Sequence, residues 1–375
     1  MDALTTPSNW QRVRLGDIGK PCMCKRVMKH QTTPYGEIPF YKIGTFGNTA
    51  DAFISKKLFL EYKAKYSFPK KGDILISASG TIGRAVIYDG KPAYFQDSNI
   101  VWIDNNETLV KNDFLFYAYS NIKWNTEHTT ILRLYNDNFR NTLIPLPPLN
   151  EQAAIANILS DLDRYLCSLD ALILKKESVK KALSFELLSQ RKRLKGFNQA
   201  WQRVRLGDIC EITTGSLDAN EMVHYGKYRF YTCAKEYYFI DKYAFDTEAI
   251  LISGNGAYVG YVHYYKGKFN AYQRTYVLDN FSEHIIFVKY FLTMFLQSHI
   301  QTNRNEGNTP YIVMATLKDF EILLPPLNEQ IAIANILSGL DNEIISLKNK
   351  KRQFENIKKA LNHDLMSAKI RVLKK

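Results

Sequence analysis

Two glycine-rich turns place polar side chains directly after apolar, strand-like runs. The first turn covers residues 77–83 (SASGTIG) and follows the run at residues 71–77, and the second covers residues 254–260 (GNGAYVG) and follows residues 249–253. Glycine allows a tight turn and lets another molecule come close to the backbone. These turns are therefore candidate places for a nucleic acid to approach, although tight hairpin-like turns would explain the same glycines.

The same glycines do not indicate a dinucleotide cofactor. A dinucleotide-binding loop needs a helix N-terminus after its glycines to hold the pyrophosphate. Residues 261–265 alternate as a strand instead, and Gly80 and Gly83 in the first turn are more closely spaced than Gly254, Gly256 and Gly260. We therefore expect this chain to bind no cofactor at either turn.

No residue pattern predicts catalysis or a metal site. The chain lacks the Asn/Asp-Pro-Pro-aromatic motif of adenine methylation and the G-x-x-x-x-G-K-[ST] motif of ATP binding. Asp161, Asp163 and Asp170 cluster in a helical stretch, but the first two do not share a helix face. Five cysteines contain no C-x-x-C pair, so Cys22 and Cys24 indicate reduced thiols rather than a zinc site. The sequence therefore argues against a self-contained nuclease.

The charge and the aromatic content favour a polyanionic partner. The chain carries 50 Lys and Arg against 37 Asp and Glu, which gives a net charge of +13, together with 24 Tyr and 21 Phe. Phosphate neutralisation by such a surface releases counterions and favours nucleic acid binding. We expect no transmembrane helix, because no apolar run reaches about 18 residues, and no membrane anchor, because no basic amphipathic helix with a clean apolar face stands out. The N-terminus lacks a signal-peptide pattern, which predicts a cytoplasmic protein.

The turns lie within a tandem repeat. Residues 147–169 (PPLNEQAAIANILSDLDRYLCSL) return at residues 325–347 (PPLNEQIAIANILSGLDNEIISL), with 17 of 23 positions identical. The octapeptide WQRVRLGD occurs at residues 10–17 and again at residues 201–208. The distance from octapeptide to Pro-Pro is 137 residues in the first half (147 − 10) and 124 in the second (325 − 201). Either the segments between these repeated motifs have diverged after the duplication, or the repeated motifs form a shared frame that holds two different recognition domains.

Each Pro-Pro pair precedes a long helical stretch with heptad spacing. Its apolar residues step by four and three, which predicts two helices paired along a seam. Lysines at residues 175–181 and 350–359 fit a solvated face of such a pair better than a DNA-backbone contact. The predicted seam consists of Ile155, Leu159, Leu162, Leu166 and Leu169 in the first helix and Ile333, Leu337, Leu340, Ile344 and Leu347 in the second, extended by Phe354, Ile357, Leu361 and Leu365.

The segments between the repeated ends predict two α+β domains of similar, strand-rich design. In the first we expect strands at residues 38–43, 71–77, 84–88 and 94–103 and a helix at 112–124. In the second we expect strands at residues 249–253, 261–265 and 271–278 and a helix at 284–299.

The repeated PPLNEQ…IANILSxLD stretch, with WQRVRLGD opening each half and KGDILIS at residues 71–77, resembles type I restriction-modification specificity subunits. The resemblance covers essentially the whole chain. It implies target recognition domains at residues 1–146 and 198–324 in a pseudo-twofold arrangement. It also implies that residues 147–197 and 325–375 form two long antiparallel helices, a coiled coil that links the domains.

The resemblance implies a non-catalytic role in DNA recognition. Each recognition domain would read one half of a bipartite double-stranded DNA target, and the coiled coil would set the spacer. The chain would direct two modification subunits, which use S-adenosylmethionine to methylate adenine at N6. Restriction subunits that use ATP and Mg would add cleavage. A stand-alone transcription factor with two DNA-binding halves is the alternative, and it would need no such partners.

The side chains available for base contacts follow from this role. Gln and Asn can pair with adenine and Arg with guanine through two hydrogen bonds. Each could equally cap a turn or face solvent. The residues predicted to contact DNA are Ser77, Ser79, Thr81, Arg84, Gln96, Asn99, Ser253, Asn255, Tyr258, Gln273, Arg274, Asn303, Arg304, Asn308 and Tyr311, and Asp97 and Ser98 lie among them.

Overall fold

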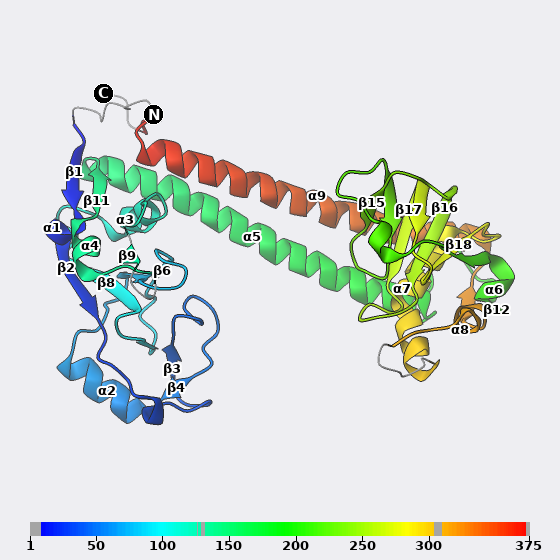
Figure 1. Cartoon of the computed structure of the whole chain (residues 1–375), viewed down its shortest axis with the longest axis horizontal. Helices are drawn as coiled ribbons and strands as arrows, with labels where there is room; N and C mark the ends of the chain where they lie inside the picture. Colours follow the sequence, from blue (N-terminus) through cyan, green and yellow to red (C-terminus); the bar gives the residue numbers. More distant parts are fainter. Residues whose placement is uncertain (1–8, 126, 129–131, 304–309, 373–375) are drawn as a thin grey trace. The chain divides into compact units, whose positions relative to one another are not determined.

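The computed structural model describes residues 9–125, 127–128, 132–303 and 310–372. The chain forms two compact units: unit 1 comprises residues 1–170 and 350–375, and unit 2 comprises residues 171–349. Two long helices, α5 (Leu149–Leu188) and α9 (Leu327–Met366), contribute to both units (Figure 1). Unit 1 is therefore completed by a separate, distant segment that contains the end of α9, whereas unit 2 is one continuous stretch of the chain.

Unit 1 is built on two sheets. The larger sheet has the order β2-β8-β5-β6, with all neighbours antiparallel. The smaller sheet has the order β4-β3-β7. A ribbon of β1 (Gln11–Arg14) and β11 (Leu143–Leu146) carries the first octapeptide. The sheet strands are β2 (Gly19–Met23), β3 (Ile38–Tyr41), β4 (Phe53–Ile54), β5 (Ile74–Ser77), β6 (Ala85–Ile87), β7 (Tyr94–Phe95) and β8 (Ile100–Asn105).

Short helices complete unit 1. Helix α2 (Lys56–Lys65) begins where the Ser55 hydroxyl accepts a hydrogen bond from the Leu58 amide, as expected for an N-cap serine. Helix α3 (Asn112–Tyr119) buries six of its eight residues against the larger sheet. The remaining elements are α1 (Leu15–Ile18), the 3-10 turn η1 (Lys29–Gln31), α4 (Asn136–Asn141), β9 (Glu127–His128) and β10 (Leu132–Arg133).

Unit 2 joins the corresponding strands into one six-stranded sheet with the order β13-β18-β16-β17-β14-β15. Its central strands β16 (Phe245–Ser253) and β17 (Val262–Ala271) are long. A ribbon of β12 (Gln202–Arg205) and β19 (Glu321–Leu324) carries the second octapeptide. The other elements are β13 (Glu211–Thr214), β14 (Tyr228–Tyr231), β15 (Tyr238–Ile240), β18 (Thr275–Asp279), α6 (Leu206–Ile209), the 3-10 turn η2 (Ala219–Glu221), α7 (Ile285–Asn303) and α8 (Met314–Lys318).

Two predicted strands are interrupted, and the prediction of continuous strands there is wrong. Residues 94–103 are divided between β7 and β8 by a turn in which Ser98 has φ = 60°. Residues 271–278 are divided by a turn between β17 and β18. Polar residues occupy both turns, QDSN at residues 96–99 and YQR at residues 272–274, so the interruption of each apolar run was a usable turn signal.

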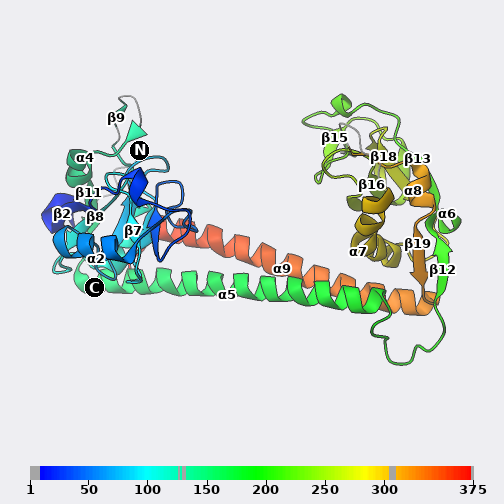
Figure 2. The same ribbon diagram turned by 90° about the horizontal axis from the view of Figure 1, so that it is seen from below.

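The two long helices run antiparallel, as predicted. They lie side by side in both views (Figures 1 and 2). In unit 1, Asp170 pairs with Lys351 at 2.7 Å and Tyr165 packs on Phe354. In unit 2, Lys176 pairs with Glu343 at 2.8 Å, and Lys180 pairs with Asp341. Several lysines of the two clusters therefore bind carboxylates on the opposite helix.

The seam has two parts. Ile155 and Leu159 are fully buried in the core of unit 1, and Ile333 and Leu337 take the same role in unit 2. Leu169 and Ile344 are also buried, whereas Leu162, Leu166, Leu340 and Leu347 are half-buried because a helix pair covers only one face. Ile357 is 48% exposed, so its assignment to the seam is wrong. Its neighbour Lys358 points to the opposite helix and pairs with Asp163.

The glutamate of each PPLNEQ motif closes its unit. Glu151 is buried and accepts hydrogen bonds from Trp10 Nε1 at 3.1 Å and from two nitrogens of Arg371 at 2.6 and 2.8 Å. The octapeptide, the start of α5 and the segment after α9 thus meet at one buried carboxylate. In unit 2 the same contacts join Glu329, Trp201 and Arg193.

The neighbouring glutamine fixes a domain helix to the long helix. Gln152 accepts a hydrogen bond from the Lys111 amide at 2.9 Å, just before α3, and donates to the Pro147 carbonyl at 2.9 Å. Gln330 accepts from the His284 amide at 3.0 Å, just before α7, and donates to Pro325 at 2.8 Å. The repeated motif is therefore a junction between each domain and its helix.

Candidate nucleic-acid interface

Three loops meet at one end of the unit 1 sheet. The Ala78 amide donates to the Asn99 carbonyl at 2.8 Å, and the Leu134 amide donates to the Ala78 carbonyl at 2.8 Å. The first glycine turn therefore lies between the turn after β7 and the strand β10. The Ser79 hydroxyl reaches across to Asn99 Oδ1 at 2.8 Å, which holds two of the predicted residues together.

Unit 2 builds the same arrangement from its own loops. The Gly254 amide donates to the Arg274 carbonyl at 2.8 Å, and the Ile312 amide donates to the Gly254 carbonyl at 2.9 Å. Isolated bridges pair Ser79 with Arg133 in unit 1 and Asn255 with Tyr311 in unit 2. The two backbones are thus equivalent at this place.

The side chains on this common backbone differ. Ser79 in unit 1 corresponds to Asn255 in unit 2, because each follows the residue that joins the three loops. By the same contacts, Asn99 corresponds to Arg274 and Arg133 corresponds to Tyr311. One surface thus presents a hydroxyl, an amide and a guanidinium where the other presents an amide, a guanidinium and a phenol. We call these six residues the reader positions.

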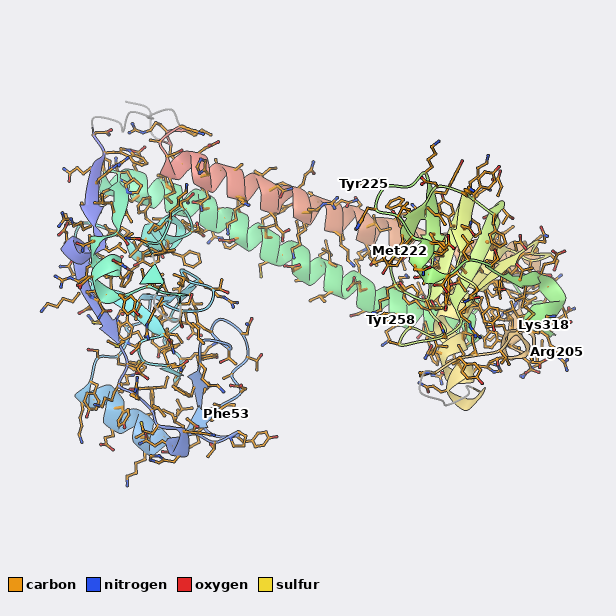
Figure 3. The ribbon with its side chains drawn as sticks, in the orientation of Figure 1. Phe53, Arg205, Met222, Tyr225, Tyr258 and Lys318 are labelled. Carbon is orange, nitrogen blue, oxygen red and sulfur yellow. The ribbon has the colours of Figure 1, made fainter. Side chains whose placement is uncertain are left out.

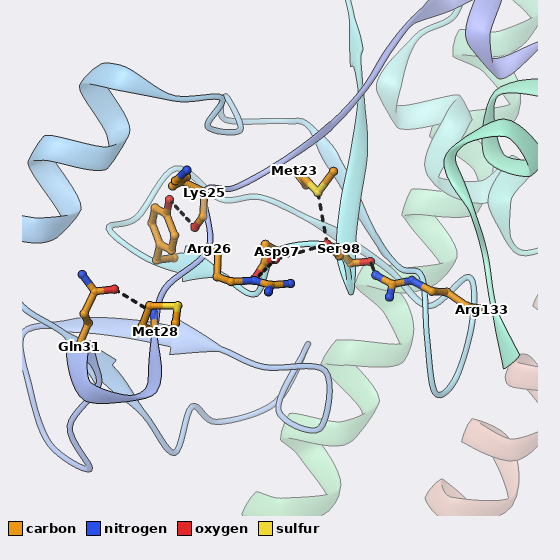
Figure 4. Close-up of polar contacts among 9 residues, drawn as sticks. Met23, Lys25, Arg26, Met28, Gln31, Asp97, Ser98 and Arg133 are labelled. Carbon is orange, nitrogen blue, oxygen red and sulfur yellow. Dashed lines mark hydrogen bonds and ion pairs between the residues drawn. The ribbon is translucent and has the colours of Figure 1, made fainter. Parts of the chain in front are cut away.

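An open pocket of about 440 Å³ borders the reader positions of unit 1. Arg26 donates from Nε to Asp97 at 2.9 Å, and Arg133 donates to the Ser98 carbonyl (Figure 4). The Arg26 side chain is 67% exposed, so its cation faces solvent. The polar residues that line this pocket include Arg26, Lys29, Thr32, Lys42, Gln96, Asp97, Ser98, Asn99 and Arg133.

The prediction that Ser77 and Ser253 contact DNA is wrong. Both are buried, at 2% and 0% exposure. The Ser77 hydroxyl donates to the Thr81 carbonyl and accepts from the Arg84 amide at 2.9 Å, so it stabilises the turn. The Ser253 hydroxyl is buried without a partner among the described residues. Neither side chain can reach a base, because each points beneath its turn instead of out of it.

The other predicted residues are distributed around the turns. Thr81 and Arg84 are exposed in unit 1, where Arg84 contacts Asn48 at 3.4 Å, and half-buried Gln96 accepts from the Ile43 amide at 2.9 Å. In unit 2, Gln273 is exposed, and Tyr258 is 43% exposed with the Lys235 ammonium over its ring. Arg304 and Asn308 lie outside the described residues, and Asn303 ends α7.

Sequence reasoning missed the reader position Arg133 and several cations near the two glycine turns. In unit 1, Arg26, Lys29 and Lys42 line the pocket that the reader position Arg133 also lines, and in unit 2 Lys235 lies over the ring of Tyr258 in the second glycine turn. The basic run at residues 25–29 (KRVMK) was a usable signal for the first two. Arg133 and Lys235 stand alone in the sequence and become neighbours of the turns only through the fold.

Burial determines the charge of one histidine under the unit 2 surface. Burial lowers the pKa of His263, against a smaller upward effect of its hydrogen bond to the Ala234 carbonyl. The ring is therefore neutral at pH 7, and Nε2 donates to that carbonyl at 2.9 Å. His263 thus supports the segment that carries Lys235 and adds no positive charge.

The described part of the chain contains no group of three or more His, Cys, Asp or Glu side chains that could hold a metal ion. Asp161, Asp163 and Asp170 instead pair with Arg164, Lys358 and Lys351 respectively. Of the helices described, none combines the length and the apolar character needed to cross a membrane.

Comparison with known proteins identifies the family. The model of the type I restriction modification DNA specificity domain matches twice, at residues 7–176 and 198–356. The chain belongs to this family of type I restriction-modification specificity proteins. The resemblance stated from the repeated motifs is thereby confirmed.

Individual relatives match either a part of this chain or nearly all of it. A putative type I restriction enzyme specificity subunit of Haemophilus influenzae is 63% identical over 148 residues, which is 39% of this chain and 38% of that protein. The match to the EcoDI specificity subunit of Escherichia coli likewise covers only 37% of that relative. The MjaVIII specificity subunit of Methanocaldococcus jannaschii is 27% identical across 99% of this chain and 95% of its own.

A solved structure shares the fold. The crystal structure of the type I restriction-modification S subunit from M. genitalium covers 97% of each chain with a TM-score of 0.65 and 18% identity. Two strand-rich domains joined by long antiparallel helices are therefore the fold of this chain, as predicted.

Proposed function

We propose that this chain is the DNA specificity subunit of a type I restriction-modification system, in which each unit reads one half of a bipartite target. One observation carries the proposal: the two units repeat the same three-loop backbone and place different hydrogen-bonding side chains on it. Two units with the same backbone and different side chains at the reader positions suit a DNA target whose two halves differ in sequence. Paired α5 and α9 would set the spacer between the halves.

The chemistry of the reader positions suits base edges. Asn99 and Asn255 could each pair with adenine, and Arg133 and Arg274 could each pair with guanine. Arg26 would contact the phosphate backbone, because its exposed pair with Asp97 contributes only about 1 kcal/mol or less and exchanges readily. The net charge of +13 supports the same partner.

Two equivalent exposed faces support the recruitment of two modification subunits. In the first turns of α5, Leu149 is 43% and Ile158 is 36% exposed, with exposed Asn157 beside them. The same three residue types recur in α9 as Leu327, Asn335 and Ile336, and they are exposed in the same way. Apolar residues that stay both identical and exposed indicate a partner surface. A stand-alone transcription factor has no use for such a surface.

The partner subunits would then supply the chemistry. Modification subunits would bring S-adenosylmethionine and methylate adenine at N6, and restriction subunits would bring ATP and Mg for translocation and cleavage. The residues of this chain would select the DNA sequence and position it.

Mapping of modified adenines tests this proposal. Cells that express the chain together with its modification subunit should carry methylated adenines in one bipartite motif, and cells that express either subunit alone should carry none. Methylation of that motif without this chain would refute the proposal. Full-affinity binding of the isolated chain, unchanged by the modification subunit, would favour the transcription-factor alternative.

A further inference from the structure

Each unit exposes one tyrosine almost completely, at the same place in its fold. Tyr35 is 85% exposed and Tyr225 is 97% exposed. Each lies between a 3-10 turn, η1 or η2, and the following strand, β3 or β14. Figure 3 shows Tyr225 on this loop of unit 2, close to Met222. Both tyrosines are followed directly by a glycine, Gly36 or Gly226.

The backbone around both tyrosines is held in the same way. Thr33 exchanges two backbone hydrogen bonds of 2.9 Å with Phe53, and the Val223 amide donates to the Phe239 carbonyl at 2.9 Å. A Cβ at Gly36 would lie 2.8 Å from the Phe53 Cβ, and one at Gly226 would lie 2.5 Å from the Ile240 nitrogen. Each glycine thus permits close packing on the adjacent strand, which fixes the loop that presents the tyrosine.

Neither phenol forms a hydrogen bond within the part of the chain that the structure describes. Among the described residues, no side chain or backbone group forms a hydrogen bond with the hydroxyl of Tyr35 or Tyr225, in contrast to Tyr117 and Tyr290, which donate to aspartates. Tyrosine combines a rigid ring with a hydrogen-bonding hydroxyl at low entropic cost, which suits an intermolecular contact. Basic residues lie close in the chain, with His224 and Lys227 around Tyr225 and Lys29 and His30 before Tyr35.

The segment that leads into each tyrosine loop lies beside the reader positions. In unit 2 the Gln273 amide, beside Arg274, donates to the Leu217 carbonyl at 2.9 Å, just before η2. In unit 1 the pocket beside Asn99 and Arg133 is also lined by Lys29 and Thr32 of the η1 segment. A duplex that touches the reader positions would therefore extend toward the tyrosine of the same unit.

We propose that Tyr35 and Tyr225 each donate a hydrogen bond from the phenol hydroxyl to a DNA backbone phosphate, one in each half-site. The inference rests on the proposed function. The reader positions differ between the units, whereas this residue is the same in both. A contact shared by two unlike half-sites must be indifferent to sequence, and phosphates are the sequence-independent part of the duplex.

The test compares Phe and Ala substitutions in the full chain bound to its modification subunits. Fluorescence anisotropy would measure the affinity for a duplex with the mapped target and for a shuffled duplex of equal length. Tyr35→Phe and Tyr225→Phe should each weaken binding of both duplexes roughly tenfold, as expected for loss of one hydrogen bond to a charged group. The Ala variants should match the Phe variants, and the double Phe variant should lose about a hundredfold.

Controls and outcomes separate this inference from the proposed function. Tyr66→Phe and Tyr243→Phe change phenols that are 43% and 45% exposed elsewhere in units 1 and 2, and they should bind as the wild type. The methylated motif should be unchanged in all variants. Unchanged affinity of the Phe variants, a loss confined to the target duplex, or a loss with Ala but not Phe would overturn the inference. Failure of the wild-type complex to prefer its target would instead refute the proposed function.

Discussion

Unit 1 and unit 2 use the same frame for different surfaces. Both close on a buried glutamate bound by a tryptophan and an arginine, and both join three loops through one backbone residue, Ala78 or Gly254. They differ in their sheets, because unit 2 has the ten-residue strand β17 where unit 1 has the short strands β6 and β7. Gly90, with φ = 86°, and Pro92, which lacks an amide hydrogen, interrupt the strand in unit 1.

The difference shows which parts of the repeat are constrained. Residues that join a domain to its helix keep both identity and contacts, because a buried carboxylate needs its partners. The sheet tolerates a broken strand and an inserted helix α2, because it only has to support the loops. The reader positions share a backbone and differ in side chain, as required if the two units recognise different sequences.

The buried glutamates Glu151 and Glu329 allow the strictest test of whether the two units are closed in the same way. Glu151→Gln and Glu329→Gln should each destabilise the chain by about 3 kcal/mol, because each leaves a guanidinium without its buried carboxylate. Urea unfolding would measure the loss. Glu321→Gln, which breaks the exposed pair with Arg203, should cost about 1 kcal/mol or less. Strongly unequal losses for Glu151→Gln and Glu329→Gln would mean that the units are not closed in the same way.

The seam residues distinguish core from helix surface. Ile155→Ala and Ile333→Ala should each cost about 2–4 kcal/mol, because both side chains are fully buried in their units. Ile357→Ala in unit 1 should cost less than about 0.5 kcal/mol, because that residue is exposed. Thermal or urea unfolding measures both effects. Equal losses at Ile155 and Ile357 would restore the uniform seam that heptad spacing predicts.

The hydrogen bonds and charges around Asp341 in unit 2 predict that the stability of the fold depends on pH. Burial raises the pKa of Asp341, but hydrogen bonds from Lys180 and Tyr290 and the charges of Lys180 and Lys289 outweigh burial, so the net shift is downward. A lowered carboxyl pKa stabilises the fold above the unfolded-state pKa, and this contribution is lost as the pH falls through the folded-state pKa.

Asp341→Asn should therefore cost about 1–2 kcal/mol at pH 7 through the lost charged hydrogen bonds. The difference from wild type should shrink as the pH falls below the unfolded-state pKa of about 4 and through the lower pKa of the folded-state carboxyl. Unfolding free energies measured across this range test the sign. A difference that grows toward low pH would contradict it. Asp163 makes the equivalent contacts to Tyr117 and Lys358, so Asp163→Asn measures how far the two aspartates agree.

The smallest expected effect is a difference in thiol reactivity between a buried and an exposed cysteine. Burial raises the pKa of Cys24 in unit 1 to about 12, and its side chain is only 2% exposed, whereas Cys167 on α5 is exposed. A maleimide at pH 7.5 should label Cys167 within minutes and leave Cys24 unmodified until the chain unfolds. Mass spectrometry of the labelled peptides measures the order. Early labelling of Cys24 would mean that the core between the two sheets of unit 1 opens.

The repeat and the periodicity were sufficient to predict the duplication, the two α+β domains and the paired helices. They could not predict that Ser77 and Ser253 point inward, because burial depends on which side of a turn faces the sheet. They also missed Arg133 and Lys235, which are distant in sequence from the turns they join. Sequence spacing identifies residues on one element, whereas a surface built from three loops depends on backbone contacts between elements.

In the proposed function, one repeated frame carries two independent recognition surfaces. The most direct measurement is a map of methylated adenines in cells that express the modification subunit with wild-type chain, Arg133→Ala or Arg274→Ala. Each loss of an arginine–guanine contact should cost about 1–3 kcal/mol of discrimination. We predict that Arg133→Ala relaxes one position in one half of the motif, that Arg274→Ala relaxes one position in the other half, and that the spacer is unchanged in both. Changes in the same half, or a motif unaffected by both substitutions, would contradict the account.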